Sequence, residues 1–457
     1  MKIHALIVKN FKKFAELELG LHPQFTLLVG ENGSGKTSVL DALAVSLGIW
    51  LVTPPDSLLR TSGRNILPTE VRLEASREGD RIQFREHFPV IVSAQGQLGS
   101  VEGVAWARAL GESGKKPRRF TKQALEIIRG LYEADAKGER VVLPVLAYYG
   151  AGRAWLPSNQ RISKETKLHG PARRWAAFYD CFNERIRFGD LNEWFRREVT
   201  ASAQRKGRMR PGFEVVRRAV LQCVEGAEDV WFDPDRDQIV LSIGGNAQPF
   251  DNLSAGQRMM FALVADLAIK AVTQNAFLLP PDDLGPEDEP LPRLLQQTPG
   301  VVLIDELDVH LHPRWQRRVA ADLKRTFPAM QFVCTSHSPQ VIGELKREEV
   351  RLLGPEGVTL PPVAFGADSN WILDHVMTGA TSESKASRTL QQQAEGALAE
   401  GDLERARSKL RELRALLDGD TGELVRLESS LATLEALAEE GDDEGDSGED
   451  DQETPTA

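Results

Sequence analysis

The spacing of apolar residues predicts that the chain begins with three strands and a helix. Apolar positions alternate or run together over residues 3–8, 15–21 and 25–29, and a segment rich in Ala and Leu follows at 36–47. Its spacing is helical. A glycine-rich segment joins the third strand to this helix, an order that indicates a nucleotide-binding opening.

The rest of the chain alternates between strand and helix patterns. Residues 71–110 hold short alternating segments that suit an antiparallel sheet, and the aromatic-rich stretch 172–224 has helical spacing. Continuous apolar runs at 301–304 and 331–334 enclose a helical segment, 314–327. Because strands that alternate with helices usually pair in parallel, this pattern over 301–334 predicts a parallel sheet.

Composition places the chain among folded globular proteins. Of its 457 residues, 41% are hydrophobic and 27% are charged. Long apolar stretches such as 262–271 are interrupted by charge, and no leader core follows Met1, so we expect neither a membrane span nor a secretory signal. Cys181, Cys223 and Cys334 include no CxxC pair, which suits a reducing cytoplasm.

Charge is distributed unevenly. Residues 439–453 hold ten carboxylates and no Lys or Arg, so most of the net charge of −11 belongs to a tail that we expect to be solvated. Residues 153–218 hold sixteen Lys or Arg against seven Asp or Glu. A surface of this kind fits nucleic acid or a protein partner equally well.

The glycine-rich segment carries the P-loop pattern GxxxxGK[ST]. The residues concerned are Gly30, Glu31, Asn32, Gly33, Ser34, Gly35, Lys36 and Thr37, followed by Ser38. Backbone N–H groups and the helix N-terminus of such a loop hold phosphates, Lys36 reaches the β and γ oxygens, and Thr37 offers a hydroxyl to Mg²⁺. The pattern therefore predicts a site for ATP and magnesium.

The apolar run 301–304 ends on two adjacent carboxylates. Ligands bind at the carboxyl ends of strands in α/β sheets. We expect Asp305 to support the magnesium ion through its water shell and Glu306 to polarise the attacking water as a general base. The alternative is an acidic pair that merely caps a helix, but a P-loop in the same chain favours the catalytic role.

Between these two sites, the segment 253–258 (LSAGQR) resembles the signature sequence of ABC-type ATPases. The resemblance implies that the chain dimerises head to tail around two ATP molecules and that this segment contacts the γ-phosphate held by the other subunit. The contacting residues are Ser254, Gly256, Gln257 and Arg258. An ordinary helix cap at Ser254 is the alternative.

Two further segments follow in the order of the same family. Asp308, directly after Glu306 and Leu307, resembles the D-loop that communicates across the dimer. The segment 336–339 (SHSP) resembles the switch-histidine segment, which implies that His337 contacts the γ-phosphate and holds the attacking water. A lone histidine at a strand end is more often structural, but four ordered motifs precede this one. The expected Q-loop glutamine is absent from residues 148–153.

The chain resembles one branch of the ABC-type ATPases in particular. Residues 7–14 and 308–315 resemble characteristic sequence motifs of RecF, SMC and OLD-like bacterial ATPases. Residues 147–153, 191–195 and 331–341 resemble the ATPase subunit of Septu-type and retron-associated anti-phage systems, over about residues 1–437. This resemblance implies an ATP-hydrolysing regulatory subunit that forms a dimer or a higher oligomer and controls an HNH nuclease.

The chain's own residues show no nuclease site. Residues 345–457 lack the Glu and DxD pattern of Toprim nucleases, and the eight histidines form no HNH cluster, so we expect any DNA cleavage to come from a partner. The alternative function is a DNA repair or chromosome-maintenance ATPase whose basic stretch, 153–218, binds DNA directly. A transporter ATPase or a scaffold is the third hypothesis.

The expected architecture is α/β: an ABC-type P-loop ATPase domain with a mixed sheet and helices, a helical insertion and a C-terminal helical hairpin. The expected segments are 1–153 for the N-terminal half with Walker A, 154–228 for the insertion, 229–378 for the C-terminal half, 379–438 for the hairpin and 439–457 for a disordered acidic tail. We expect a cytoplasmic protein without a membrane partner.

Overall fold

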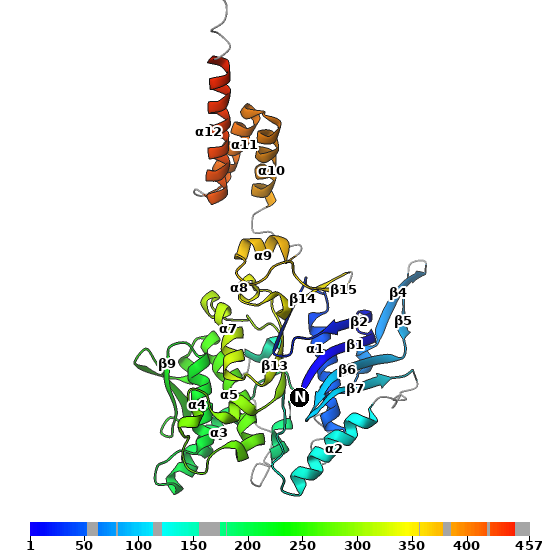
Figure 1. The fold of residues 1–457 in the computed structure, drawn as a ribbon, viewed down its shortest axis with the longest axis vertical. Coiled ribbons are helices and arrows are strands. Elements are labelled where there is room, and N and C mark those ends of the chain that lie inside the picture. The colour runs from blue at the N-terminus through cyan, green and yellow to red at the C-terminus, as the bar shows by residue number, and fades with distance from the viewer. Residues whose placement is uncertain are drawn as a thin grey trace, which may run out of the picture. The chain divides into compact units, whose positions relative to one another are not determined.

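A six-stranded sheet lies at the centre of residues 1–378, in the order β15-β14-β3-β13-β12-β8 (Figure 1). Its strands are β3 (Phe25–Val29), β8 (Val145–Tyr149), β12 (Gly300–Ile304), β13 (Met330–Thr335), β14 (Val350–Gly354) and β15 (Gly357–Thr359). All neighbouring pairs are parallel except β14 and β15, so the sheet is mixed, as the fold prediction states. The strands β3, β13, β12 and β8 are buried along their whole length, as is typical of parallel strands covered on both faces.

The computed structural model describes residues 1–52, 63–78, 81–112, 121–154, 174–179, 181–355, 357–377, 385–417 and 421–443. These residues belong to two compact units, 1–378 and 379–457.

A second, antiparallel sheet follows the order β2-β1-β6-β7. Its strands are β1 (Lys2–Phe11), β2 (Phe14–Gly20), β6 (Val90–Leu98) and β7 (Val101–Leu110). The antiparallel segments predicted over 71–110 are present, but β4 (Arg72–Glu78) and β5 (Arg81–His87) pair only with each other. β6 instead pairs with β1, a partner distant in sequence that no local pattern could indicate.

Helix α1 (Lys36–Leu47) contacts strands of both sheets and lies in one of the two hydrophobic cores found in the described part of the larger unit. α5 (Ala255–Asn275) belongs to the other core, together with α4 (Pro211–Cys223) and α7 (Pro313–Thr326). Strand β3 separates the two cores, because Leu27 packs into the α5 core and Leu28 into the α1 core. The loop after β3 therefore leaves the centre of the fold.

The remaining elements complete the larger unit. They are α2 (Lys122–Ala136), α3 (Phe188–Gln204), α6 (Arg293–Gln297), α8 (Pro339–Gly343), α9 (Ser369–His375), and the small antiparallel sheet of β9 (Ala227–Asp233), β10 (Gln238–Ile243) and β11 (Asn246–Pro249). Besides the short 3-10 helix Arg174–Phe178, the described part of the predicted insertion contains the helices α3 and α4. Both pack against α5 (Figure 1).

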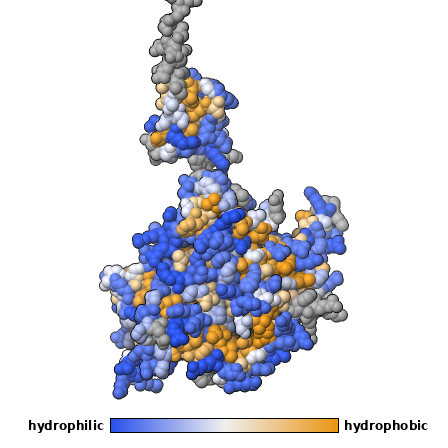
Figure 2. Space-filling model, in the orientation of Figure 1, coloured by the Kyte–Doolittle hydropathy of each residue, from blue (hydrophilic) through white to orange (hydrophobic). Residues whose placement is uncertain are grey.

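One helical segment among the described residues, Ala255–Leu278, is long and apolar enough to cross a membrane by length and composition. Half of its most apolar window is buried inside the protein, and α5 packs against α4 and β8. These contacts are those of a core helix. Hydrophilic residues cover most of the face drawn in Figure 2, with apolar patches between them.

The described part of the smaller unit contains three helices where a hairpin of two was expected: α10 (Lys385–Glu400), α11 (Leu403–Leu416) and α12 (Gly422–Asp443). The predicted break near residues 418–421 falls between α11 and α12. A second break lies at Gly401, whose φ of 74° favours glycine, and Asp402 then caps α11. α12 extends into the predicted acidic tail, and residues 444–457 lie outside the described residues.

Candidate active site

The glycine-rich loop joins β3 to the N-terminus of α1, as predicted. Gly33 and Gly35 have φ values of 78° and 103°, in the left-handed region that favours glycine. A Cβ at Gly35 would collide with the ring of Phe14 on β2. The neighbouring Lys13 donates from Nζ to the carbonyl oxygen of Gly33 (2.6 Å), so the β1–β2 turn holds the loop from outside.

Lys36 is the first residue of α1 and turns back over the loop. Its Nζ donates to the carbonyl oxygens of Gly30 (2.8 Å) and Glu31 (3.0 Å). Burial lowers the pKa of Lys36, while the nearby carboxylates of Asp305 and Glu306 raise it. The lysine therefore lies within electrostatic reach of the strand-end acidic pair, although these segments are far apart in sequence.

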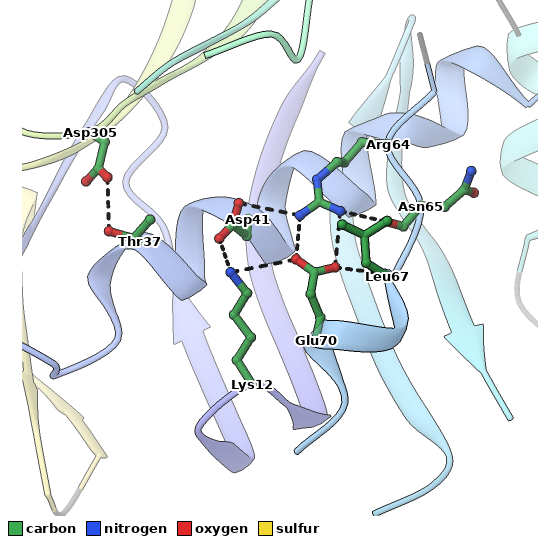
Figure 3. A network of polar contacts seen from close by, with 8 residues as sticks. All are labelled: Lys12, Thr37, Asp41, Arg64, Asn65, Leu67, Glu70 and Asp305. Carbon is green, nitrogen blue, oxygen red and sulfur yellow. Dashed lines mark hydrogen bonds and ion pairs between the residues drawn. The ribbon is translucent and has the colours of Figure 1, made fainter. Parts of the chain in front are cut away.

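Asp305 is held by hydroxyl groups from two different elements. Thr37 on α1 donates from Oγ1 to Oδ2 of Asp305 (2.9 Å), as Figure 3 shows. Thr335, the last residue of β13, donates from Oγ1 to Oδ1 (2.6 Å). Each carboxylate oxygen thus accepts a hydrogen bond from one hydroxyl group. These two bonds fix the orientation of the carboxylate toward the start of α1.

Glu306 follows Asp305 with a φ of 49°, an unusual conformation for a residue other than glycine. Its backbone N–H donates to Oγ1 of Thr335 (2.7 Å). Thr335 therefore orients both acidic residues, a role that the sequence analysis missed. The available signal was a hydroxyl residue at the end of an apolar strand directly before Ser336 and His337.

His337 lies half-buried just after β13. Burial lowers the pKa of His337, and the positive charge of Lys36 lowers it further, against the opposing effect of Asp308, Glu306 and Asp305. The imidazole is accordingly neutral at physiological pH. These influences place His337 near Lys36 and the acidic pair, as the sequence analysis expected.

An ion-pair network anchors α1 one turn after Thr37 (Figure 3). Asp41 and Glu70 are almost fully buried, with 6% and 2% of their surface exposed. Both carboxylates pair with Lys12 and with Arg64; the longer of these contacts measure 3.7 Å (Lys12 to Glu70) and 3.5 Å (Arg64 to Asp41). The sequence analysis missed this network because its members come from separate segments with no shared motif.

The signature segment forms the N-terminus of α5. Oγ of Ser254 accepts from the Gln257 N–H (3.2 Å), and Oε1 of Gln257 accepts from the Ser254 N–H (3.0 Å), which is a capping box. Ser254 and Arg258 are exposed. None of the hydrogen bonds found for this segment in the described residues reaches the glycine-rich loop of the same chain. The structure thus brings together Lys36, Thr37, Asp305, Glu306 and His337, but not Ser254.

The residues of this site fit a magnesium nucleotide. Among the described residues, Oγ of Ser34 is a buried polar atom in the loop without a hydrogen-bond partner. Thr37 and Asp305 supply the hard oxygen atoms that Mg²⁺ prefers. No group of three or more His, Cys, Asp or Glu side chains suited to a metal occurs in the described residues. Mg²⁺ commonly binds through one or two protein oxygens together with phosphates and water, so a larger protein cage is not required.

Several arginines in the described part of the basic stretch form ion pairs with carboxylates. The ion pairs are Arg196 with Glu193 and Asp237, Arg197 with Glu193, Arg210 with Glu198, Arg217 with Glu214 and Asp229, and Arg218 with Glu214 and Glu289. These partners offset much of the local positive charge. Residues 155–173 of the stretch lie outside the described residues.

A P-loop between a central strand and α1, joined by Thr37 to an acidic pair at the end of a parallel strand, is the arrangement of a P-loop ATPase fold. Comparison with known families agrees with this class. Residues 1–47 match the family described as "AAA ATPase domain", and residues 231–343 match the family described as "AAA domain, putative AbiEii toxin, Type IV TA system".

The chain is also similar to ATPases of two named systems. It is 22% identical over 412 residues to "Retron Vc95 probable ATPase" of Vibrio cholerae serotype O1 biovar El Tor, covering 77% of this chain and 73% of that one. It is 23% identical over 353 residues to "Septu protein PtuA" of Bacillus mycoides (strain KBAB4), covering 76% and 38%. The alignment thus spans about two fifths of the Septu relative. These similarities confirm the expected relationship to retron-associated and Septu ATPases.

Among solved structures, the crystal structure of the SmcHead bound to the C-winged helix domain of ScpA aligns with a TM-score of 0.45 and 16% identity. That alignment covers 79% of this chain and 97% of the other.

Proposed function

We propose that the chain binds ATP with Mg²⁺ and hydrolyses it. The observation that carries this proposal is the continuous set of hydrogen bonds from Thr37 through Asp305 and Thr335 to Glu306. It joins the start of the phosphate-binding helix to the backbone of Glu306, whose carboxylate is suited to act as general base. A structural acidic pair has no need of such a connection.

In this proposal the loop N–H groups from Gly30 to Ser38 hold the phosphates, and Lys36 neutralises their charge. A bound magnesium ion, held through Thr37 and Asp305, supplies further charge neutralisation at the β and γ oxygens. Glu306 accepts a proton from the attacking water, and the neutral imidazole of His337 orients that water. The two roles are compatible because a neutral histidine adds no competing positive charge beside Glu306.

We further propose that two copies associate head to tail around two ATP molecules. The signature residues Ser254, Gly256, Gln257 and Arg258 of one copy, with Asp308, would complete the site of the other; Ser254 and Arg258 are exposed at the start of α5. Higher oligomers are compatible with this arrangement. By similarity to the Septu and retron ATPases, the chain would act in the cytoplasm as the regulatory subunit of an anti-phage complex that controls an HNH-type nuclease.

The decisive experiment assays ATP hydrolysis and plasmid cleavage by the chain alone and together with the product of its neighbouring gene. Lys36→Ala is the control that removes nucleotide binding. We expect hydrolysis by the chain alone, and cleavage only in the mixture, with a rate that changes when ATP is added. Absence of hydrolysis by the wild-type chain would refute the ATPase assignment; ATP-independent cleavage would refute nucleotide control.

The DNA repair alternative has less support, because several of the described arginines of the basic stretch are paired with carboxylates. It predicts hydrolysis that rises on addition of duplex DNA and a steep dependence on salt. A hydrolysis rate indifferent to DNA would leave the regulatory subunit as the better proposal.

A further inference from the structure

The segment that follows Glu306 forms a tight turn, residues 307–311. The N–H of Val309 donates to the Glu306 carbonyl (3.1 Å), and the N–H of Leu311 donates to the Asp308 carbonyl (3.0 Å). His310 in this turn has a φ of 60°. The turn is therefore a defined unit whose first hydrogen bond begins at Glu306 itself, so a shift of the turn moves Glu306.

The signature helix packs directly on this turn. A Cβ at Gly256 would lie 2.8 Å from the carbonyl oxygen of His310 and 3.7 Å from Cδ2 of Leu311. No side chain fits between the two backbones, which explains the need for glycine here. Displacement of the N-terminus of α5 would therefore be transmitted to the turn.

Gln316 on α7 joins the same turn to the loop that carries His337. Its Nε2 donates to the carbonyl oxygen of Leu311 (2.9 Å) and lies 3.4 Å from that of Asp308. Its Oε1 accepts from Oγ of Ser338 (2.7 Å), the residue directly after His337. An amide is the side chain that can donate to carbonyl groups at one end and accept from a hydroxyl at the same time.

We propose that Gln316 is a positioning residue that couples the signature helix and the 307–311 turn to His337. Contact of a second copy with the exposed start of α5 would then adjust Glu306 and His337 together. Oδ1 of Asp308 in this turn is buried without a hydrogen-bond partner among the described residues, so the turn retains an acceptor for a donor from outside. This inference rests on the proposed ATP hydrolysis and dimer formation.

The test compares Gln316→Met, which keeps the length of the side chain but removes its hydrogen bonds to the turn and to Ser338, with the wild type. We expect kcat to fall about tenfold with KM and nucleotide affinity unchanged, because only the placement of catalytic groups is altered. Formation of the ATP-bound dimer can be measured by sedimentation in a Glu306→Gln background. The dimer should form at the same protein concentration with and without Gln316→Met.

A matched control is available at Gln340, whose Oε1 also accepts from Ser338 Oγ (3.1 Å). This is the only hydrogen bond found for the Gln340 side chain in the described residues, and none reaches the 307–311 turn. Gln340→Met should therefore retain the wild-type kcat. The double variant Gln316→Met with Ser338→Ala should lower kcat no more than the more harmful single substitution does, since both substitutions remove the same hydrogen bond.

Three results would overturn the coupling role. They are a kcat within twofold of wild type for Gln316→Met, an equal loss in Gln340→Met, or a fall in kcat matched by a fall in nucleotide affinity, which indicates general damage. If the wild-type chain itself fails to hydrolyse ATP, the proposed function fails first and this inference falls with it. If wild type is active and Lys36→Ala is not, a negative result at Gln316 counts against the coupling alone.

Discussion

Thr335 shows how a single hydroxyl group can orient two acidic residues. The Glu306 N–H can only donate, so Oγ1 of Thr335 must accept from it and must donate its own proton to Asp305. No other arrangement satisfies all three groups. The orientation of Asp305 and the unusual backbone of Glu306 therefore depend on a neighbouring strand.

Replacing Thr335 by Val keeps the shape of the side chain and removes this hydroxyl. We expect the free energy of unfolding to fall by about 1–3 kcal/mol, because a buried carboxylate oxygen and an N–H lose their partner. The kcat of ATP hydrolysis should fall as well. Urea unfolding and an ATPase assay measure both quantities, and Thr335→Ser is the control that keeps the hydroxyl. Equal behaviour of the two variants would contradict this role.

Replacing Glu306 by Gln tests the general base. The amide keeps the backbone N–H bond to Thr335 but cannot accept a proton from water, so we expect hydrolysis to fall by about 10²–10⁴-fold. Nucleotide affinity, measured by calorimetry, should persist, and ATP-bound dimers should accumulate. Hydrolysis at the wild-type rate would show that the proton acceptor is another group.

At the scale of elements, local pattern was sufficient wherever an element is defined by its own residues. The structure has β3 and α1 at the predicted positions, and β12 and β13 are parallel neighbours. Pattern failed for the pairing of β6 with β1 and for the break at Gly401. The first depends on contacts far apart in sequence, and one glycine within an amphipathic stretch is compatible with a continuous helix.

The candidate site divides in the same way. Lys36, Thr37, Asp305 and Glu306 stand in short motifs whose chemistry is visible in the sequence, and the structure brings them together. No motif indicates the contacts of Thr335, of Gln316 or of the ion pairs around Asp41, although some of these residues lie in segments that resemble related ATPases. Each acts through a partner from another element, so its role is defined only when the chain is folded.

Helix α3 carries a buried carboxylate whose effect on stability should depend on pH. Glu198 pairs with Arg210 (3.3 Å) through one oxygen, and its other oxygen is buried without a hydrogen-bond partner among the described residues. Burial raises the pKa of Glu198, although Arg210 and Arg205 lower it. The folded protein thus holds the proton of Glu198 more tightly than the unfolded chain does. The stability that this group contributes is therefore lost as the pH rises above the ordinary pKa of a glutamate.

We therefore expect Glu198→Gln to be more stable than wild type at pH 7, with an advantage that shrinks as pH falls toward the ordinary pKa of a glutamate. Urea unfolding of both proteins across this pH range measures the difference. Taking the difference cancels the titration of all other groups. An advantage that stays constant with pH, or a variant less stable at pH 7, would show that ionisation of Glu198 has no net cost.

At the scale of the whole molecule, the proposed catalytic groups are divided between two surfaces of one chain. Lys36 and Glu306 lie at the central sheet, whereas Ser254 is exposed at the start of α5 with its hydrogen bonds confined to its own helix cap. If a complete site needs the loop of one copy and the signature of another, neither surface alone is sufficient. Two different inactive variants should then restore activity when mixed.

Lys36→Ala loses the phosphate-binding lysine but keeps an intact signature, and Ser254→Arg keeps the lysine but blocks the signature surface. A mixed dimer contains one intact site, formed by the loop of the second variant and the signature of the first. Since half of the dimers in an equal mixture are mixed and each has one working site, we expect about a quarter of the wild-type rate. The measurement is ATP hydrolysis against mixing ratio, with cross-linking to count mixed dimers. Mixed dimers that form but do not hydrolyse ATP would show that each chain relies on its own signature or that both sites must be intact. Hydrolysis by Ser254→Arg alone would show that the signature surface is not required.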